Sequence, residues 1–149
     1  MAIEYTYYSA ADLTTEALRS QVAAVLGGTV TEDGTVVRDG LQTTAYHADP
    51  GDEAVAPGLF GFRHRITVRF RFSAVHREFE EHNTALMASV VIGLAGADGV
   101  LLFNGEEAVI QVTGGAVIFN AEWDDWAENP ETAPLLTQFP SRVLPQPLL

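Results

Sequence analysis

The sequence predicts an α+β fold, a two-layer sandwich in which two helices pack on one face of a mostly antiparallel sheet. Three observations lead to this prediction. The segments run strand, helix, hairpin, strand, helix and meander, without the strict alternation that is typical of parallel sheets. The clearest strand, residues 62–72, alternates apolar and polar side chains, so it has one buried face. At 149 residues, of which 47% are hydrophobic, the chain can bury a core without disulfides.

The first half of the chain is predicted to form a strand, a helix and a hairpin. Residues 3–8 are rich in β-forming residues. Thr14 has the position of an N-cap before a run with helical periodicity, and Gly27-Gly28 is expected to end that helix. Asp39-Gly40 is a strong hairpin signal, and the Pro- and Gly-rich stretch 49–61 is predicted to be a loop.

The second half is predicted to form a strand, a long helix and a meander. Residues 62–72 are the strand, and Ser73 is expected to cap a helix over 75–95. Val75 begins the apolar stripe of this helix. The strands of the meander are residues 100–103, 108–112 and 116–119, joined by the tight turns Asn104-Gly105 and Gly114-Gly115.

We expect one domain over residues 1–149, because this is a common length for a single domain and no internal repeat is present. Its core is expected over residues 1–120. An acidic segment that holds both tryptophans follows at 121–133, and a tail punctuated by prolines follows at 134–149.

Charge is the informative part of the composition. There are 20 acidic residues against 8 basic ones, which gives a formal net charge of -12 at pH 7, and every basic residue is arginine. Such a surface either serves solubility alone or attracts a basic partner by electrostatic steering. It argues against nucleic acid and against an anionic membrane as ligands, since both would be repelled.

The absence of cysteine and the hydrophobic pattern of the chain indicate which chemistry and which cellular compartment to expect. Without cysteine there is no disulfide framework, thiol nucleophile or zinc knuckle. The first residues lack the basic and apolar regions of a signal peptide, and the longest apolar stretch, 85–97, is too short to span a bilayer. We therefore expect a cytoplasmic protein that uses no cofactor.

The acidic tryptophan segment is the first candidate for partner binding. Tryptophan is enriched at interface hot spots, and acidic rims steer a basic partner onto them. In the alternative interpretation, the tryptophans close the core while the acids are solvated. A second acidic patch lies at the Asn104-Gly105 hairpin, where the alternative is simply a charged hairpin end. The candidate partner-binding residues are Trp123, Asp124, Asp125, Trp126 and Glu128, with Glu106 and Glu107 as the second patch.

Half of the basic residues lie on the predicted strand 62–72. Their side chains either pair with acidic residues of neighbouring strands on an exposed face, or form an anion-binding face through forked guanidinium groups. The second interpretation describes a small-molecule binding domain or an unrecognised enzyme. The residues concerned are Arg63, Arg65, Arg69 and Arg71.

Catalytic and metal-binding motifs are not found in the sequence. His76 with Glu80 and Glu78 with His82 have helical spacing, but no third ligand accompanies them, so a solvated helix face is the simpler interpretation. Neither a nucleophile elbow nor a phosphate-binding loop is present. We therefore favour binding over catalysis. A further hypothesis is an adaptor subunit that docks through its tail, residues 135–149.

Three segments resemble a known family. They are Ile66-Thr-Val-Arg-Phe-Arg-Phe72, then His76-Arg-Glu-Phe-Glu-Glu81, and then Val100-Leu-Leu-Phe-Asn-Gly-Glu106. In this order they resemble the Sit-type immunity proteins, small bacterial proteins that protect a cell from a polymorphic toxin delivered by its kin. The resemblance spans residues 1–120. It implies binding and neutralising a cognate toxin domain rather than catalysis, and the excess of acidic residues favours a basic toxin.

Overall fold

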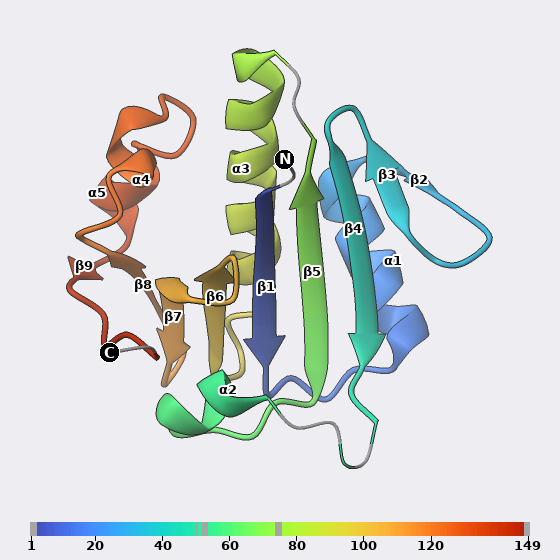
Figure 1. Ribbon diagram of the computed structural model, residues 1–149, viewed down its shortest axis with the longest axis horizontal. Coiled ribbons are helices and arrows are strands. Elements are labelled where there is room, and N and C mark those ends of the chain that lie inside the picture. Colours follow the sequence, from blue (N-terminus) through green and yellow to red (C-terminus); the bar gives the residue numbers. More distant parts are fainter. Residues whose placement is uncertain (1–2, 50, 52–53, 74–75, 148–149) are drawn as a thin grey trace.

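The computed structural model describes residues 3–49, 51, 54–73 and 76–147. These contain one nine-stranded sheet in the order β2-β3-β4-β5-β1-β6-β7-β8-β9 (Figure 1). Neighbouring strands are antiparallel except for β8 and β9. The strands are β1 (Ile3–Ser9), β2 (Thr29–Val30), β3 (Val36–Arg38), β4 (Leu41–His47), β5 (Ile66–Phe72), β6 (Gly99–Phe103), β7 (Glu107–Thr113), β8 (Ala116–Asn120) and β9 (Ser141–Arg142).

Five helices accompany the sheet in the described part of the chain, so the predicted α+β fold is confirmed. In that part, no helix combines the length and the hydrophobicity that crossing a membrane requires. The helices are α1 (Thr15–Leu26), α2 (Val55–Leu59), α3 (Arg77–Gly93), α4 (Asp125–Glu128) and α5 (Leu135–Gln138).

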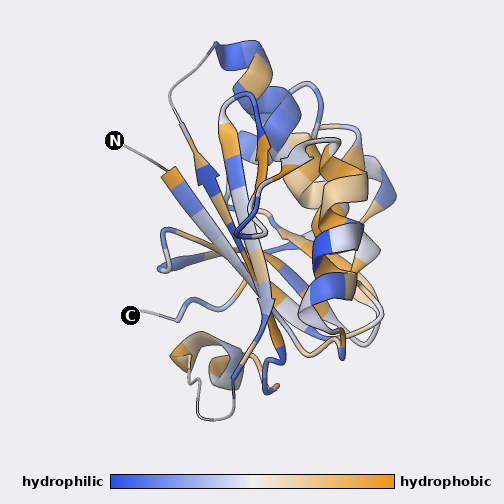
Figure 2. Cartoon of the chain, turned by 90° about the vertical axis from the view of Figure 1, so that its right-hand side faces the viewer, coloured by the Kyte–Doolittle hydropathy of each residue, from blue (hydrophilic) through white to orange (hydrophobic). Residues whose placement is uncertain are grey.

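The two long helices, α1 and α3, pack against each other on the same side of the sheet (Figure 2). Each helix buries an apolar stripe, which includes Leu18 and Val22 in α1 and Met87 and Val91 in α3. These side chains meet the inward-facing residues of the central strands in the main hydrophobic core. The prediction that two helices cover one face is therefore confirmed.

The opposite face of the sheet is covered only in part, by α2 and the C-terminal tail (Figure 2). Ala56 of α2 and Leu144 of the tail pack with Val100 and Leu102 of β6 in a second, smaller apolar cluster. The Gln146 side chain accepts a hydrogen bond from the Ala108 amide at 2.7 Å, which fixes the tail against β7. Both faces of β6 are thus buried, which explains its nearly continuous apolar sequence.

Local signals placed the first helix and the turns correctly. The Thr14 hydroxyl accepts a hydrogen bond from the Ala17 amide at 3.1 Å, so Thr14 is the N-cap of α1. Gly27 ends α1 in the left-handed conformation, with φ of 66°. The three-residue β6–β7 turn, residues 104–106, places Asn104 and Gly105 at φ of 50° and 72°, the left-handed conformation that Asn and Gly tolerate best.

The strand predicted over 62–72 begins later, at Ile66. Its partners explain the difference, because Ile66 is the first residue of β5 that pairs with β1 and also the first that pairs with β4. Arg63 and Arg65 therefore precede the strand, and only Arg69 and Arg71 stand on it. The alternation of apolar and polar residues begins before Ile66, where pairing with β1 and β4 begins, so the alternation alone predicted a strand that starts too early.

Two other predicted boundaries differ from the structure. The stretch 49–61 contains the short helix α2, which forms because Ala56 and Pro57 are buried against the sheet. Helix α3 begins at Arg77 after His76, whose side chain makes no capping hydrogen bond, so the prediction that Ser73 caps this helix is wrong. Pro50, Val75 and the end of the tail at Leu149 lie outside the described residues.

Gly99 of β6 lies so close to the Tyr7 side chain of β1 that replacing this glycine by alanine should destabilise the protein. A Cβ atom added to Gly99 would lie 2.0 Å from the Tyr7 hydroxyl oxygen, within the buried sheet. We expect Gly99→Ala to lower the free energy of unfolding by about 1–3 kcal/mol, because the Tyr7 ring must shift in a packed core. Urea unfolding measures this loss. Gly96→Ala is the control, since no atom lies within 4 Å of its added Cβ; equal losses in the two variants would refute the clash.

Candidate functional site

A polar stripe runs along the first half of α3. The stripe follows from helical spacing, because residues three, four and seven positions apart lie on one face. The apolar residues that pack on the sheet are concentrated in the second half of the helix. The first half therefore extends charged side chains away from the core. The residues of this stripe are Arg77, Glu80, Glu81 and Thr84.

Helix α4 forms the second wall of the site and is anchored by its own buried residue. Trp126 is 1% exposed, and its indole N–H donates to the Val109 carbonyl of β7 at 3.0 Å. The Thr132 hydroxyl donates to the Trp126 carbonyl at 2.7 Å and closes the turn that follows α4. With Trp126 buried, Asp125 and Glu128 on the same short helix line the cavity that faces α3.

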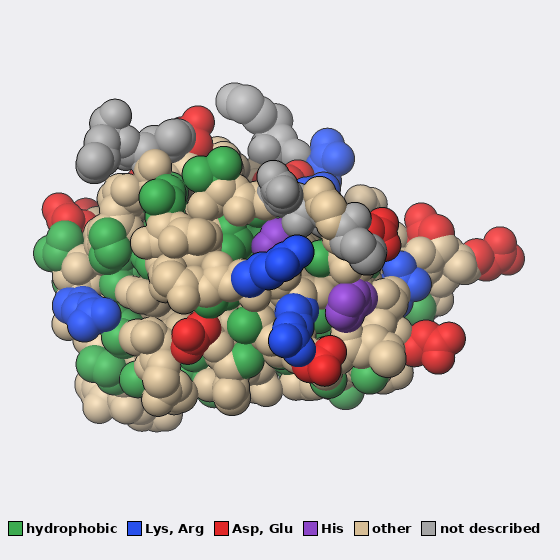
Figure 3. Space-filling model, turned by 90° about the horizontal axis from the view of Figure 1, so that it is seen from below, with side chains coloured by type: hydrophobic (Ala, Val, Ile, Leu, Met, Phe, Trp, Pro, Cys, Tyr) green, Lys and Arg blue, Asp and Glu red, His purple; other side chains and the backbone are tan. Residues whose placement is uncertain are grey.

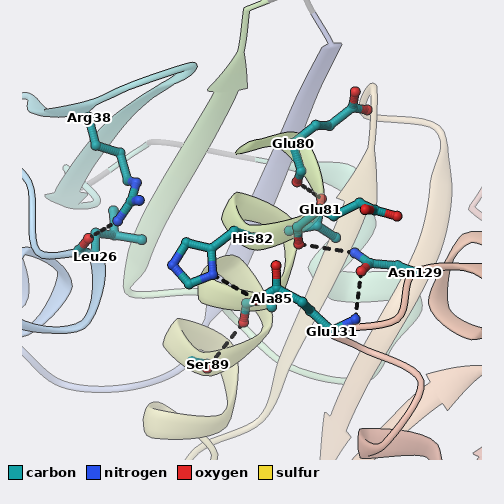
Figure 4. Close-up of polar contacts among 10 residues, drawn as sticks. Leu26, Arg38, Glu80, Glu81, His82, Ala85, Ser89, Asn129 and Glu131 are labelled. Atoms are coloured by element: carbon teal, nitrogen blue, oxygen red, sulfur yellow. Dashed lines mark hydrogen bonds and ion pairs between the residues drawn. The ribbon is translucent and has the colours of Figure 1, made fainter. Parts of the chain in front are cut away.

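Two polar contacts connect this segment to α3 (Figure 4). The Asn129 side-chain amide donates to the Glu81 carbonyl at 3.1 Å. Glu131 lies 2.7 Å from the Nδ1 atom of His82, and its backbone N–H donates to the Asn129 side-chain oxygen at 2.9 Å. The two walls are therefore held at a fixed separation by bonds between them, which favours a preformed site.

Tyr5 of β1 lies at the floor between the walls. Its ring makes edge contacts with Phe72 and Phe103, at centroid distances of 5.6 and 5.2 Å, and the side chain is 6% exposed. The resulting acidic cleft has a volume of about 390 Å³. The acidic cleft is lined by Tyr5, Arg77, Glu80, Glu81, Thr84, Asp125, Glu128 and Asn129.

Negative charge dominates the acidic cleft. Four of its lining residues are carboxylates and one is an arginine, and that arginine pairs with Glu81 at 3.6 Å. Burial raises the pKa of the Tyr5 phenol well above its usual value, and the charges of Asp125, Glu80 and Glu107 raise it further. The phenol therefore stays neutral in a field that attracts cations. Chemically, the arrangement suits a positively charged group rather than an anion.

Comparison with known proteins gives one match. A family profile described as SitI3-like matches residues 3–130. The chain belongs to the SitI3-like family. SitI-type names denote immunity proteins, so the resemblance inferred from sequence is confirmed. Searches of curated proteins and of solved structures gave no significant match.

The family match includes the whole acidic cleft. Its lining residues run from Tyr5 to Asn129, all within the matched residues 3–130. The tail that carries α5 and β9 lies beyond the match. The acidic cleft thus belongs to the part of the chain that is similar to the SitI3-like family.

The partner-binding residues predicted from sequence occupy different environments. Asp125 and Glu128 line the acidic cleft, and Asp124 is exposed beside them at the start of α4. Trp123 is half-buried, with its ring 4.8 Å from that of Phe103, whereas Trp126 lies in the core. Trp126 therefore positions α4, and a partner can reach only Trp123 of the two tryptophans.

The two glutamates of the β6–β7 hairpin also differ. Glu107 is opposite Phe103 in the pairing of β6 with β7, and Phe103 is opposite Tyr5 in the pairing of β1 with β6. Directly paired residues share a face of the sheet, so Glu107 lies on the side of the Tyr5 ring. Glu106 is exposed in the turn and does not line the acidic cleft.

Sequence reasoning missed Tyr5, Glu80 and Glu81 as site residues. The available signal was the change of character within α3, whose first turns are charged while its last turns are apolar. That signal marks a surface but not what faces it. The opposing wall lies more than forty residues further along the chain, and only the fold brings the two together.

The arginines of the alternative anion site are divided between ion pairs and solvent. Arg65 lies 3.5 Å from Asp12, and Arg69 lies 3.3 Å from Glu4, all with exposed side chains. Basic and acidic side chains are interspersed on the face seen in Figure 3. Arg63 and Arg71 are exposed and form no ion pair within the described part of the chain. Paired arginines suit an exposed sheet face better than an anion receptor.

A second cavity, of about 280 Å³, lies on the sheet face opposite α3. Thr67, Arg69 and Tyr46 contribute to its lining, beside α2. Among the described lining residues, Arg69 brings the single guanidinium, which already faces the Glu4 carboxylate. A bound anion would have to displace that contact.

The histidine–carboxylate pairs considered for metal binding are arranged differently. His82 contacts Glu131 of the acidic segment rather than acting with Glu78. Among residues 3–49, 51, 54–73 and 76–147, no group of three potential ligands is placed to hold a metal ion. His82 thus serves the connection between α3 and the acidic segment.

Proposed function

We propose that this protein is an immunity protein that binds a cognate toxin domain in the cytoplasm and neutralises it as a stoichiometric complex. Membership of the SitI3-like family is the observation that carries the proposal. Neutralising a toxin by forming a complex needs no catalytic group. The acidic cleft suits binding because its walls are connected by hydrogen bonds and lined by carboxylates. The continuous core that joins α4 to the sheet supports a single domain, with the tail packed as part of it.

The surface we propose for the toxin consists of the acidic cleft and its rim. The rim residues are Asp124 and Trp123 at the start of α4, together with Glu106 and Glu107 of the neighbouring hairpin. Fixed walls reduce the conformational cost of association, and their charge accelerates encounter with a basic partner. The proposed toxin domain is therefore basic, and the excess of acidic residues supports this.

Co-expression tests the proposal. The C-terminal domain encoded by the neighbouring gene is produced alone, with this protein, and with an unrelated acidic protein of similar size. We expect growth arrest with the toxin domain alone, rescue by this protein only, and a stoichiometric complex on size-exclusion chromatography with light scattering. Persistent arrest in the presence of folded protein, or neither arrest nor a complex, would overturn the proposed function.

A further inference from the structure

We propose that the acidic cleft receives an arginine side chain of the toxin, whose guanidinium donates a hydrogen bond to the Tyr5 hydroxyl. This inference rests on the proposed function and specifies the chemistry of its partner. The evidence for it is the Tyr5 hydroxyl itself, together with the distribution of carboxylates on the two walls.

The Tyr5 hydroxyl has no hydrogen-bond partner among the described residues, although the side chain is 6% exposed. Asp125 and Glu80 are close enough to raise its pKa, yet the hydroxyl donates to neither. The Tyr5 hydroxyl is not one of the fully buried polar atoms, because it opens into the acidic cleft that the residue lines. It therefore offers a hydrogen-bonding position at the floor of the acidic cleft that a ligand can use.

The unpaired carboxylates indicate the charge of that ligand. Glu81 is the only cleft carboxylate with an ion-pair partner within the described residues, at 3.6 Å from Arg77. Glu80 on the α3 wall and Asp125 and Glu128 on the α4 wall have none there. The acidic cleft therefore offers hydrogen-bond acceptors on both walls and at its floor. Three of its carboxylates form no ion pair within the described residues.

Arginine matches this arrangement better than lysine or a metal ion. Its planar guanidinium presents several donors in a fixed fork, so it can reach both walls and the floor together, and it is more weakly hydrated than an ammonium group. The Asn129–Glu81 contact holds the two walls apart at a set distance, which suits a flat group that enters without rearrangement. A metal ion is less well suited, because no group of three potential ligands among the described residues is placed to hold one.

The first experiment uses N-acetyl-arginine amide as the probe and the full-length protein. NMR titration is expected to shift the Tyr5 ring signals and the α4 backbone signals, and N-acetyl-citrulline amide, the neutral isostere, is expected to leave them unchanged. Asp125→Asn should weaken binding of the arginine probe. Equal shifts with the two probes, or no shift at Tyr5 with the arginine probe, would overturn the proposal.

The variant Tyr5→Phe distinguishes this role from a structural one. The ring and its contacts with Phe72 and Phe103 are retained, and the hydroxyl opens into the acidic cleft, so we expect the melting temperature to stay the same when the hydroxyl is removed. Arginine binding should fall by about tenfold, as expected for one hydrogen bond to a charged group. A lower melting temperature with unchanged binding would show that the hydroxyl is structural and would refute its role in recognition.

The outcomes separate this inference from the proposed function. Rescue from the toxin by both the wild type and Tyr5→Phe, with equal affinities, would leave immunity intact and exclude the acidic cleft as the arginine site. Arginine binding without rescue or complex formation would support a guanidinium site and overturn immunity.

Discussion

Replacing Trp126 with alanine is expected to lower the free energy of unfolding by about 3–5 kcal/mol, the range for a large aromatic residue removed from a core. Trp126 is 1% exposed and makes an edge contact with Phe119 at a centroid distance of 5.2 Å. Its indole N–H also bonds the Val109 carbonyl, which the substitution leaves without its donor. Urea unfolding monitored by circular dichroism measures the loss.

Trp123→Ala is the matched control, since both tryptophans belong to the same acidic segment. Trp123 is only half-buried and contacts Phe103 at the edge of the core, so its removal leaves a smaller cavity and costs less. We expect a loss well below that of Trp126→Ala. Comparable losses would mean that the core does not extend beneath α4 as the structure indicates.

The elements predicted most accurately are those with strong local signals. Helix α1 has a side-chain N-cap at Thr14 and a glycine at its end, and both operate within a few residues. The meander β6–β8 is similar, because tight turns define the pairing of consecutive strands. Such features depend little on the rest of the chain.

The elements predicted less well depend on distant partners. Strand β5 begins where its pairing with β1 and β4 begins, so its boundary is not encoded in its own alternation. Helix α2 lies in a Pro- and Gly-rich stretch and is stabilised by burial against β6 rather than by helix propensity. The parallel pairing of β8 with β9 joins residues across the acidic segment, and no local pattern predicts it.

The candidate site shows the same division. Asp125 and Glu128 were identified because acidic residues beside tryptophan are typical of interfaces. Sequence could not separate the two tryptophans, because the segment is too short for periodicity to assign one to the core. Tyr5 looked like an ordinary strand residue, and its role as the floor of the acidic cleft depends on α3 and α4 meeting above it.

The largest expected effect on function comes from inverting the charge of the acidic cleft. We expect the double variant Glu80→Lys and Glu128→Lys to weaken the toxin complex by at least about 30-fold, because each wall then repels the basic group it should bind. The two residues lie on opposite walls and make no ion pair within the described chain. Affinity is measured by calorimetry with the purified toxin domain, and the biological effect is the loss of rescue.

A second double variant, Glu32→Lys and Asp49→Lys, changes the net charge of the protein by the same amount. Both residues are exposed and neither lines the acidic cleft, and Glu32 lies beside β2 at the far edge of the sheet from α4. If acidity acts only through long-range steering or solubility, the two double variants should weaken binding equally. If the acidic cleft is the contact, the control variant should lose little affinity. Its association rate should fall in a salt-dependent way, while its dissociation rate should stay unchanged. Equal losses would therefore reassign the acidic excess to the whole surface and remove the cleft from the interface.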